Sequence, residues 1–221
     1  FVDTIDGFEY RLASLTNKML SDNQEKKTIG FMIGHGEMSP AQEMMTFASI
    51  ASQQYNLVPV SANPDEPLPL DDVDVLVVTS PKEPLGTSHE NSLAVYIRMG
   101  GKAFLNLESV LVDTQQLAGL PNRHSLSDFI EREFGVILEE NIVYDLQSNE
   151  TLGFSAGTRG NVMLPYPYWI RAVIEDKKVA GNVDSVVLAW ANTLGILDLP
   201  GSEYTITPLI SSTNLSLILI S

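Results

Sequence analysis

The sequence predicts an α/β fold in which a doubly wound, mostly parallel sheet is followed by additional C-terminal strands. Two observations carry this prediction. Short apolar, strand-like runs alternate with helix-like segments up to about residue 145, and beyond that point Pro, Gly and Asn become frequent while β-type runs take over. A chain of 221 residues, 44% of them hydrophobic, is long enough and apolar enough to bury a large core.

The elements follow from local sequence patterns. Amphipathic spacing or capping residues predict helices over residues 8–20, from Ser39 to near Tyr55, from Ser88 to Met99 and over 126–134, with Ser39 and Ser88 as N-caps. Apolar runs predict strands at 28–33, 57–60, 73–79, 102–107, 136–138 and 141–145. Residues 108–123 are predicted to be a loop, and β-type runs at 184–190 and 203–210 are expected to extend the sheet. This order of elements is that of an open, flavodoxin-like sheet.

The domain organisation is predicted from the change in composition. Residues 1–145 are expected to form the α/β core, and residues 146–221 a β-rich C-terminal extension of the same domain. We interpret the chain as a fragment of a longer, membrane-tethered protein, whose anchors would lie outside these residues.

Charge and cysteine content exclude several function classes. Thirteen Lys and Arg against 28 Asp and Glu give a net charge of −15, which disfavours a nucleic-acid partner. The absence of Cys removes disulfides, thiolate nucleophiles and Cys-ligated zinc. The longest apolar run, residues 186–191, is far shorter than the roughly 20 residues that cross a bilayer.

A loop that follows the first strand is the leading candidate site. Gly34, His35, Gly36 and Glu37 lie where a strand passes into a helix, and ligands bind at such edges of open α/β sheets. Glycine lets the backbone turn sharply and approach a ligand, while His35 and Glu37 offer a donor and an acceptor. A small polar ligand is one interpretation of this loop, and a purely structural turn is the other.

The strand at 73–79 ends next to a second group of candidates. Ser80 and Lys82 follow it, and Ser80 is expected to share an edge of the sheet with His35. A hydrolase or carbohydrate-active enzyme that uses His35 with Glu37 or Ser80 is therefore an alternative. Pro81 and the absence of a Gly-x-Ser-x-Gly elbow argue against it, so no catalytic residue is predicted.

The remaining candidates are histidines and aromatic residues. His35, His89 and His124 are scattered without metal-ligand spacing, so neither a metal nor a cofactor is predicted. Tyr166, Tyr168 and Trp169 stand in a proline-rich run and offer a stiff platform for a sugar or a partner protein. The alternative is that these rings close one end of the sheet.

The ordered motifs resemble the extracytoplasmic auxiliary components of ABC-type transport systems, a family that includes GldG-like gliding-motility proteins. The resemblance is carried by several motifs in the right order: Gly34-His35-Gly36-Glu37 after a strand, Ser80-Pro81-Lys82 after a buried strand, Tyr96 with Gly100-Gly101-Lys102, Asn141 to Asp145, Pro165 to Trp169, and Thr207 to Thr213.

This resemblance implies a fold related to class I glutamine amidotransferases and to the GIFT domain of intraflagellar transport. It also implies a non-catalytic domain on the outer face of the cytoplasmic membrane, in the periplasm or outside the cell, beside ABC permease and ATPase subunits. A carbohydrate ligand and a homo-oligomer are further expectations.

Overall fold

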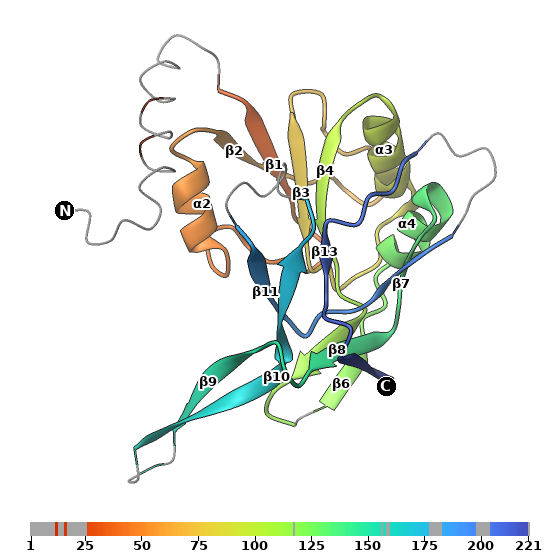
Figure 1. Cartoon of the computed structure of the whole chain (residues 1–221). Helices are drawn as coiled ribbons and strands as arrows, with labels where there is room; N and C mark the ends of the chain where they lie inside the picture. The colour runs from red at the N-terminus through yellow and green to blue at the C-terminus, as the bar shows by residue number, and fades with distance from the viewer. Residues whose placement is uncertain are drawn as a thin grey trace. The chain divides into compact units, whose positions relative to one another are not determined.

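The computed structural model describes residues 26–116, 118–155, 160–176, 183–197 and 204–220, together with Leu12, Thr16 and Gly157. The predicted helix at 8–20 lies outside these residues apart from Leu12 and Thr16, which are helical. The chain divides into two compact units (Figure 1). The first contains the described residues up to Pro81 together with Leu85–Asn106, and the second contains Lys82–Pro84 and the described residues from Leu107 onward.

The first unit is built on a four-stranded parallel sheet, which confirms the predicted α/β class at the level of a parallel sheet with crossover helices. Its strand order is β2-β1-β3-β4, and its elements are β1 (Thr28–Met32), α2 (Met45–Ala51), β2 (Asn56–Val60), β3 (Val75–Thr79), α3 (Thr87–Arg98) and β4 (Lys102–Asn106). Helix α2 connects β1 to β2, and α3 connects β3 to β4, as parallel neighbours require. Because β1 and β3 are central and apolar, their side chains form much of the core of this unit.

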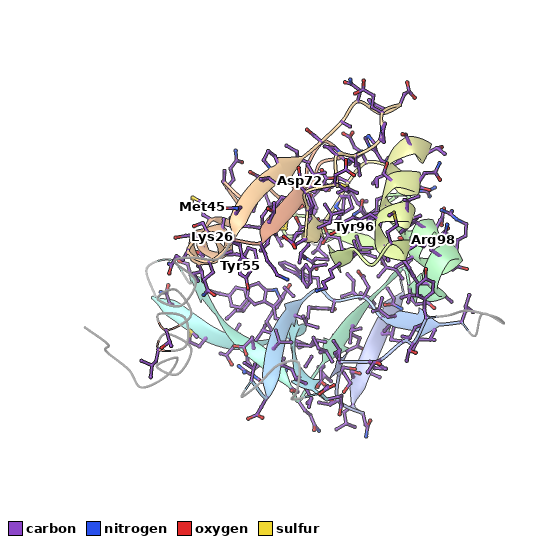
Figure 2. All side chains as sticks on the ribbon, turned by 90° about the horizontal axis from the view of Figure 1, so that it is seen from above. Lys26, Met45, Tyr55, Asp72, Tyr96 and Arg98 are labelled. Atoms are coloured by element: carbon purple, nitrogen blue, oxygen red, sulfur yellow. The ribbon has the colours of Figure 1, made fainter. Side chains whose placement is uncertain are left out.

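The two crossover helices begin differently from the prediction. Residues 40–44 form turns, so α2 starts at Met45 rather than at Pro40, and Met45 stays largely exposed (Figure 2). Gly86 rather than Ser88 is the N-cap of α3. The glycine stop after Met99 is confirmed, since Gly100 has a φ of 92°.

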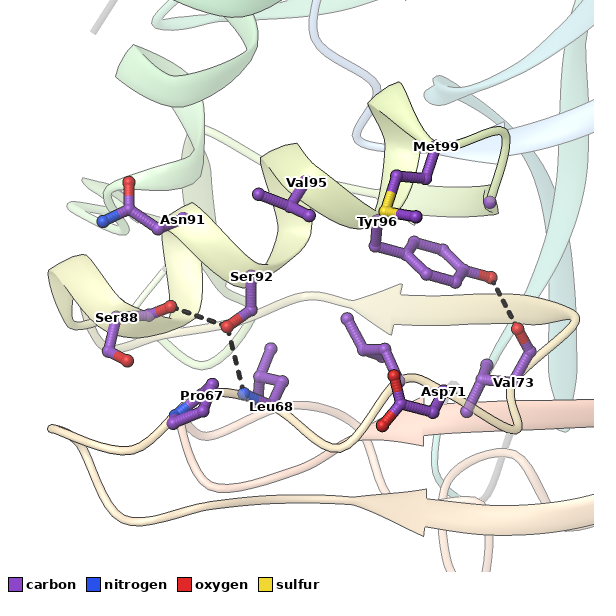
Figure 3. A pocket seen from close by; sticks show the side chains of 12 residues that line it. Pro67, Leu68, Asp71, Val73, Ser88, Asn91, Ser92, Val95, Tyr96 and Met99 are labelled. Carbon is purple, nitrogen blue, oxygen red and sulfur yellow. Dashed lines mark hydrogen bonds between the residues drawn. The ribbon is translucent and has the colours of Figure 1, made fainter.

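A side chain holds the end of α3 against the sheet. The Tyr96 hydroxyl donates to the carbonyl of Val73 or of Lys102, at 3.1 and 3.2 Å (Figures 2 and 3). A Cβ on Gly101 would lie 2.5 Å from the Tyr96 ring. Only glycine therefore fits at residue 101 beneath this ring.

The second unit contains one described helix and short antiparallel pairings. Its elements are β5 (Val110–Asp113), β6 (Ala118–Pro121), α4 (Leu126–Phe134), β7 (Val136–Leu138), β8 (Asn141–Asp145), β9 (Asn149–Ser155), β10 (Asn161–Ile174), β11 (Ser185–Ala189), β12 (Leu194–Ile196), β13 (Ile210–Ser211) and β14 (Ser216–Ile220). One sheet has the order β11-β10-β13 with β9 also on β10, and the pairs β12-β7, β14-β8 and β5-β6 complete the unit.

Three expectations are corrected here. The segment 108–123, predicted as a loop, contains the β5-β6 hairpin, in which the buried Val110 lies opposite Pro121. The late strands pair antiparallel within the second unit and do not extend the parallel sheet. The composition shift near residue 146 lies inside this unit, because β8 pairs with β14 and Val143 packs against Ile170 and Ala172.

Candidate functional site

Two neighbouring strands bring the predicted loop and the predicted serine to one edge of the parallel sheet. Since β1 and β3 are adjacent and parallel, both end at the same edge. The Met38 N–H donates to the Thr79 carbonyl at 3.0 Å, which joins the loop after β1 to the last residue of β3. The loop at His35 and the turn at Ser80 are therefore neighbours at this edge, as predicted.

A chain of hydrogen bonds runs inward from this loop. The Nδ1 atom of His35 lies 3.0 Å from Oε1 of Glu37, and the backbone N–H of His35 donates to Oε2 of Glu37 at 2.7 Å. The Nε2 atom of His35 lies 3.0 Å from Nδ1 of His89, and Nε2 of His89 lies 3.0 Å from the Asn63 carbonyl oxygen. We call Glu37, His35, His89 and Asn63 the rim cluster.

Three side chains of the rim cluster are largely shielded from water, whereas Asn63 is an exposed residue. His89 is 1% exposed, His35 is 8% exposed, and the Glu37 side chain is 1% exposed. A carbonyl oxygen only accepts hydrogen bonds, so His89 must donate from Nε2 to Asn63. These side chains thus anchor the loop from beneath, and they fix the proton on one nitrogen of His89.

The two glycines of the loop face the other way. Gly34 and Gly36 are exposed and have φ values of 121° and 76°, a region that favours glycine. A Cβ on Gly34 would meet no atom within 4 Å, so the backbone there is open to approach. The loop consequently presents its main chain outward, while its two polar side chains point into the protein.

Ser80 occupies a strained backbone position at the same edge. Its φ is 49°, it is buried, and it precedes the buried Pro81, which normally pushes the preceding residue toward extended backbone. Its N–H donates to the Asn106 carbonyl at 2.8 Å. Lys82 is exposed and belongs to the second unit.

The geometry bears directly on the predicted hydrolase alternative. Glu37 holds the Nδ1 side of the His35 ring, as a carboxylate does beside a catalytic base. The other ring nitrogen, which would have to activate a nucleophile, points at His89. Both ring nitrogens of His35 thus have partners other than Ser80.

A separate pocket of about 610 Å³ lies in the first unit between α3 and the segment 67–73 (Figure 3). Its walls are mainly apolar, and Val95 and Met99 expose their side chains on its α3 side. The Ser92 hydroxyl is already engaged, because it donates to the Ser88 carbonyl at 2.8 Å and accepts from the Leu68 N–H at 3.1 Å. Burial, which outweighs the hydrogen bond to the Lys102 carbonyl, raises the pKa of Tyr96 in the same wall.

The aromatic motif of the second unit forms a packed cluster. Tyr166, Tyr168 and Trp169 are half-buried on β10, and they are joined by Trp190, whose ring meets Trp169 edge to face at 5.6 Å. Trp190 itself has a φ of 50°, and its N–H donates to the Tyr168 carbonyl at 2.8 Å. The indole N–H of Trp169 is buried and has no hydrogen-bond partner among the described residues.

Sequence comparison identifies the family. The chain matches the protein family described as "ABC-type uncharacterized transport system" (ABC_transp_aux) over residues 26–219. The chain belongs to this family. It is thus an auxiliary component of an ABC-type transport system, in line with the resemblance drawn from its motifs. No curated protein sequence matches the chain.

Among solved structures, this ABC-transport component is similar to one described as "mmIFT52 N-terminal domain". The TM-score is 0.61 at 11% sequence identity, and the likeness covers 86% of this chain and 75% of the other. At this identity the likeness concerns the fold alone.

Sequence reasoning missed three residues that the structure assigns to these clusters of the ABC-transport component. His89 and Asn63 belong to the rim cluster, although in the sequence His89 is one of three scattered histidines. Trp190 belongs to the aromatic cluster because β10 and β11 pair with Trp169 opposite Ala189. No local motif marks these contacts; the pairing of distant segments creates them.

Among the described residues, no helix is long and apolar enough to cross a membrane, and no group of three or more His, Asp or Glu is placed to hold a metal ion.

Proposed function

We propose that this protein is a non-catalytic, extracytoplasmic domain of an ABC-type transport or gliding-motility complex, and that it docks against a permease or ATPase-associated subunit through the loop after β1. Family membership supports the association with ABC transport. The proposed extracytoplasmic location, the membrane tether and the relationship to gliding-motility proteins rest on the resemblance of the sequence motifs to that family. The fold likeness over 86% of the chain is compatible with a GIFT-like, amidotransferase-related and doubly wound architecture.

The observation that carries this proposal is that residues 34–37 bury their polar side chains and expose their glycines. The side chains of His35 and Glu37 are buried in the rim cluster, whereas Gly34 and Gly36 are exposed and Gly34 has open space around its Cα. A rigid loop loses little conformational entropy on binding, so a held glycine loop is a favourable docking element. Its backbone N–H and C=O groups suit a protein partner or a small polar ligand.

The same arrangement supports a binding role rather than catalysis. A general base needs a ring nitrogen within hydrogen-bond reach of the proton that it removes. In the rim cluster both ring nitrogens of His35 face protein groups, Glu37 and His89. Turnover of an ester, amide or glycoside that is lost on His35→Gln would contradict the non-catalytic proposal.

The experiment that tests the docking proposal is co-purification of the tagged, full-length protein from its native membranes in mild detergent. ABC permease and ATPase subunits are expected to co-purify. Ile33, 37% exposed beside the glycine loop, and Leu146, 66% exposed in the second unit, offer a matched pair of surface substitutions. Ile33→Asp should lose the subunits and Leu146→Asp should retain them. Retention by both variants would contradict docking through this loop, and absence of transporter subunits from the unmodified protein would contradict the proposed partner.

A carbohydrate ligand is a second candidate, because four half-buried aromatic rings gather on β10 and at the end of β11. Stacking of a sugar on such rings would stabilise the native state, so a thermal-shift screen with oligosaccharides tests it. A rise in Tm that disappears in Trp190→Ala, in a variant that retains its fold, is the expected result. No shift with any oligosaccharide would remove this candidate.

A further inference from the structure

We infer that the rim cluster is a proton-binding site: His35 and His89 together with Glu37 hold one proton more than an ionised carboxylate and two neutral rings would carry. The inference concerns the cluster itself and stands whether or not the loop is a docking surface. It follows from counting the hydrogens that the three side-chain contacts Glu37–His35, His35–His89 and His89–Asn63 require.

The two ends of the hydrogen-bond chain fix two of these protons. At one end, the Asn63 carbonyl accepts, so His89 carries a hydrogen on Nε2. At the other end, an ionised Glu37 also only accepts, so His35 carries a hydrogen on Nδ1. A neutral imidazole has a single N–H, and both rings have now used theirs.

The middle contact then requires a third proton. With both rings neutral, bare lone pairs on Nε2 of His35 and Nδ1 of His89 would face each other across 3.0 Å. The ring centroids are 5.1 Å apart, about 2 Å farther than the nitrogens, so each nitrogen points almost directly at the other. One proton between them converts this repulsion into a charge-assisted hydrogen bond.

The alternative placement of the protons gives the same count. If Glu37 is protonated, it donates to Nδ1 of His35, which then donates from Nε2 to His89, and His89 donates to Asn63. In both arrangements the cluster holds three hydrogens on these bonds and has no net charge. Neutrality suits a site in which His89 is 1% exposed, because an isolated charge is costly to bury.

Acidic side chains lie beside the cluster on the elements that meet there. Glu37 contacts His35 directly. From the segment after β2, Glu66 accepts from the Asn63 side-chain amide at 2.8 Å, and on α3 Glu90 follows His89 in the chain. Ser80 and Thr79, at the end of β3, carry no charge.

The proton links the loop to α3. When the proton leaves, the facing lone pairs separate His35 from His89, and residues 34–38 lose their side-chain contact with the first turn of α3. The loop is therefore anchored in the protonated cluster and released from α3 in the deprotonated one.

Glu37→Gln removes the need for the extra proton and keeps every hydrogen bond of the cluster. The glutamine oxygen can accept from the His35 backbone N–H, and the glutamine N–H₂ can donate to Nδ1 of His35. Both rings are then satisfied in their neutral, Nε2-protonated forms. His89→Gln does the same from the other side, because its amide N–H can donate to Nε2 of His35.

The test is a pH titration of the full-length protein and both variants, between about pH 5 and about pH 9, by long-range ¹H–¹⁵N NMR of the imidazole nitrogens and ¹³C NMR of the Glu37 carboxyl. In the unmodified protein we expect the cluster to hold three protons at the acidic end and to lose one in a single step. The amides of residues 34–38 should shift with the same midpoint. In both variants that step and the linked amide shifts should be absent.

Two results would overturn the inference. The first is a cluster that holds only two protons at every pH. The second is uptake of protons by His35 and His89 in independent steps, with both rings becoming imidazolium and with Glu37→Gln titrating like the unmodified protein. His124 serves as an internal control in the same spectra, because it lies outside the rim cluster. Its Nε2 donates to the Glu108 carbonyl at 3.0 Å.

Discussion

The Nε2 atom of His35 lies 3.0 Å from the Nδ1 atom of His89, although 54 positions separate these residues in the chain. The contact ties the loop that follows β1 to the first turn of α3, and α3 itself follows the turn at Ser80. A single pair of side chains thus connects the loop after β1 to the helix that follows β3.

Replacing His89 by an apolar residue should destabilise the protein. In His89→Phe the Asn63 carbonyl and Nε2 of His35 both lose their partner, and an unsatisfied buried polar group costs about 1–3 kcal/mol. His89→Gln, which retains a donor, should cost less. Urea unfolding followed by circular dichroism gives both free energies of unfolding; equal losses would mean that packing, rather than hydrogen bonding, is what His89 contributes.

Gly101→Ala should destabilise the first unit by about 1–3 kcal/mol through overpacking. The added Cβ would lie 2.5 Å from the Tyr96 ring, which is held in place by the hydrogen bond from its hydroxyl to the carbonyl of Val73 or of Lys102. Gly153→Ala is the matched control, because its Cβ would meet only the flexible Met163 sulfur, at 3.2 Å. Chemical denaturation of both variants compares them directly.

The same prediction has an internal check. Adding Tyr96→Ala to Gly101→Ala should cost less than the sum of the two single losses, because the clash disappears with the ring. Strictly additive losses would show that Tyr96 is not the obstacle at position 101.

Asp145 should make stability depend on pH in the acidic range. Burial alone would raise the pKa of Asp145, but hydrogen bonds from Thr213, Ser148 and Gln147 outweigh it and hold this pKa below its usual value. The folded state therefore favours the carboxylate, and the stabilisation is fully present above about pH 3.9, the ordinary Asp value. It is lost as the pH falls from there through the lower folded-state pKa.

Free energies of unfolding measured between about pH 2 and about pH 5 test this dependence. Asp145→Asn should flatten the profile in that range, whereas Asp72→Asn, at an exposed position, should leave it unchanged. A profile that is as steep in Asp145→Asn as in the unmodified protein would assign the acid sensitivity to other groups.

The parallel sheet could be predicted because its information is local. The apolar runs around Phe31 and Val77 identify buried strands, and the glycines at 100 and 135 end helices in the left-handed conformation. The β5-β6 hairpin was missed because Gly119 and Pro121 are poor strand formers. There, pairing with β5 overrides local preference.

The position of the loop at 34–37 was also predictable, since glycines between a strand and a helix mark the edge of an α/β sheet. The contacts of its side chains were not predictable. The partner of His35 comes from a helix far along the chain, and the acceptor of His89 is a main-chain carbonyl, which no residue type marks in the sequence. The place of Trp190 was unpredictable for the same reason, because the register of β10 with β11 brings it to Trp169.

The most direct test of the central claim is site-specific photocrosslinking in intact cells, with the photoreactive residue placed at Ile33 beside the exposed glycines or, as a control, at Leu146. We expect crosslinks from position 33 to an ABC permease or ATPase-associated subunit, and few from position 146. Crosslinks that form equally from both positions, or from position 146 alone, would contradict docking through the loop that the rim cluster anchors.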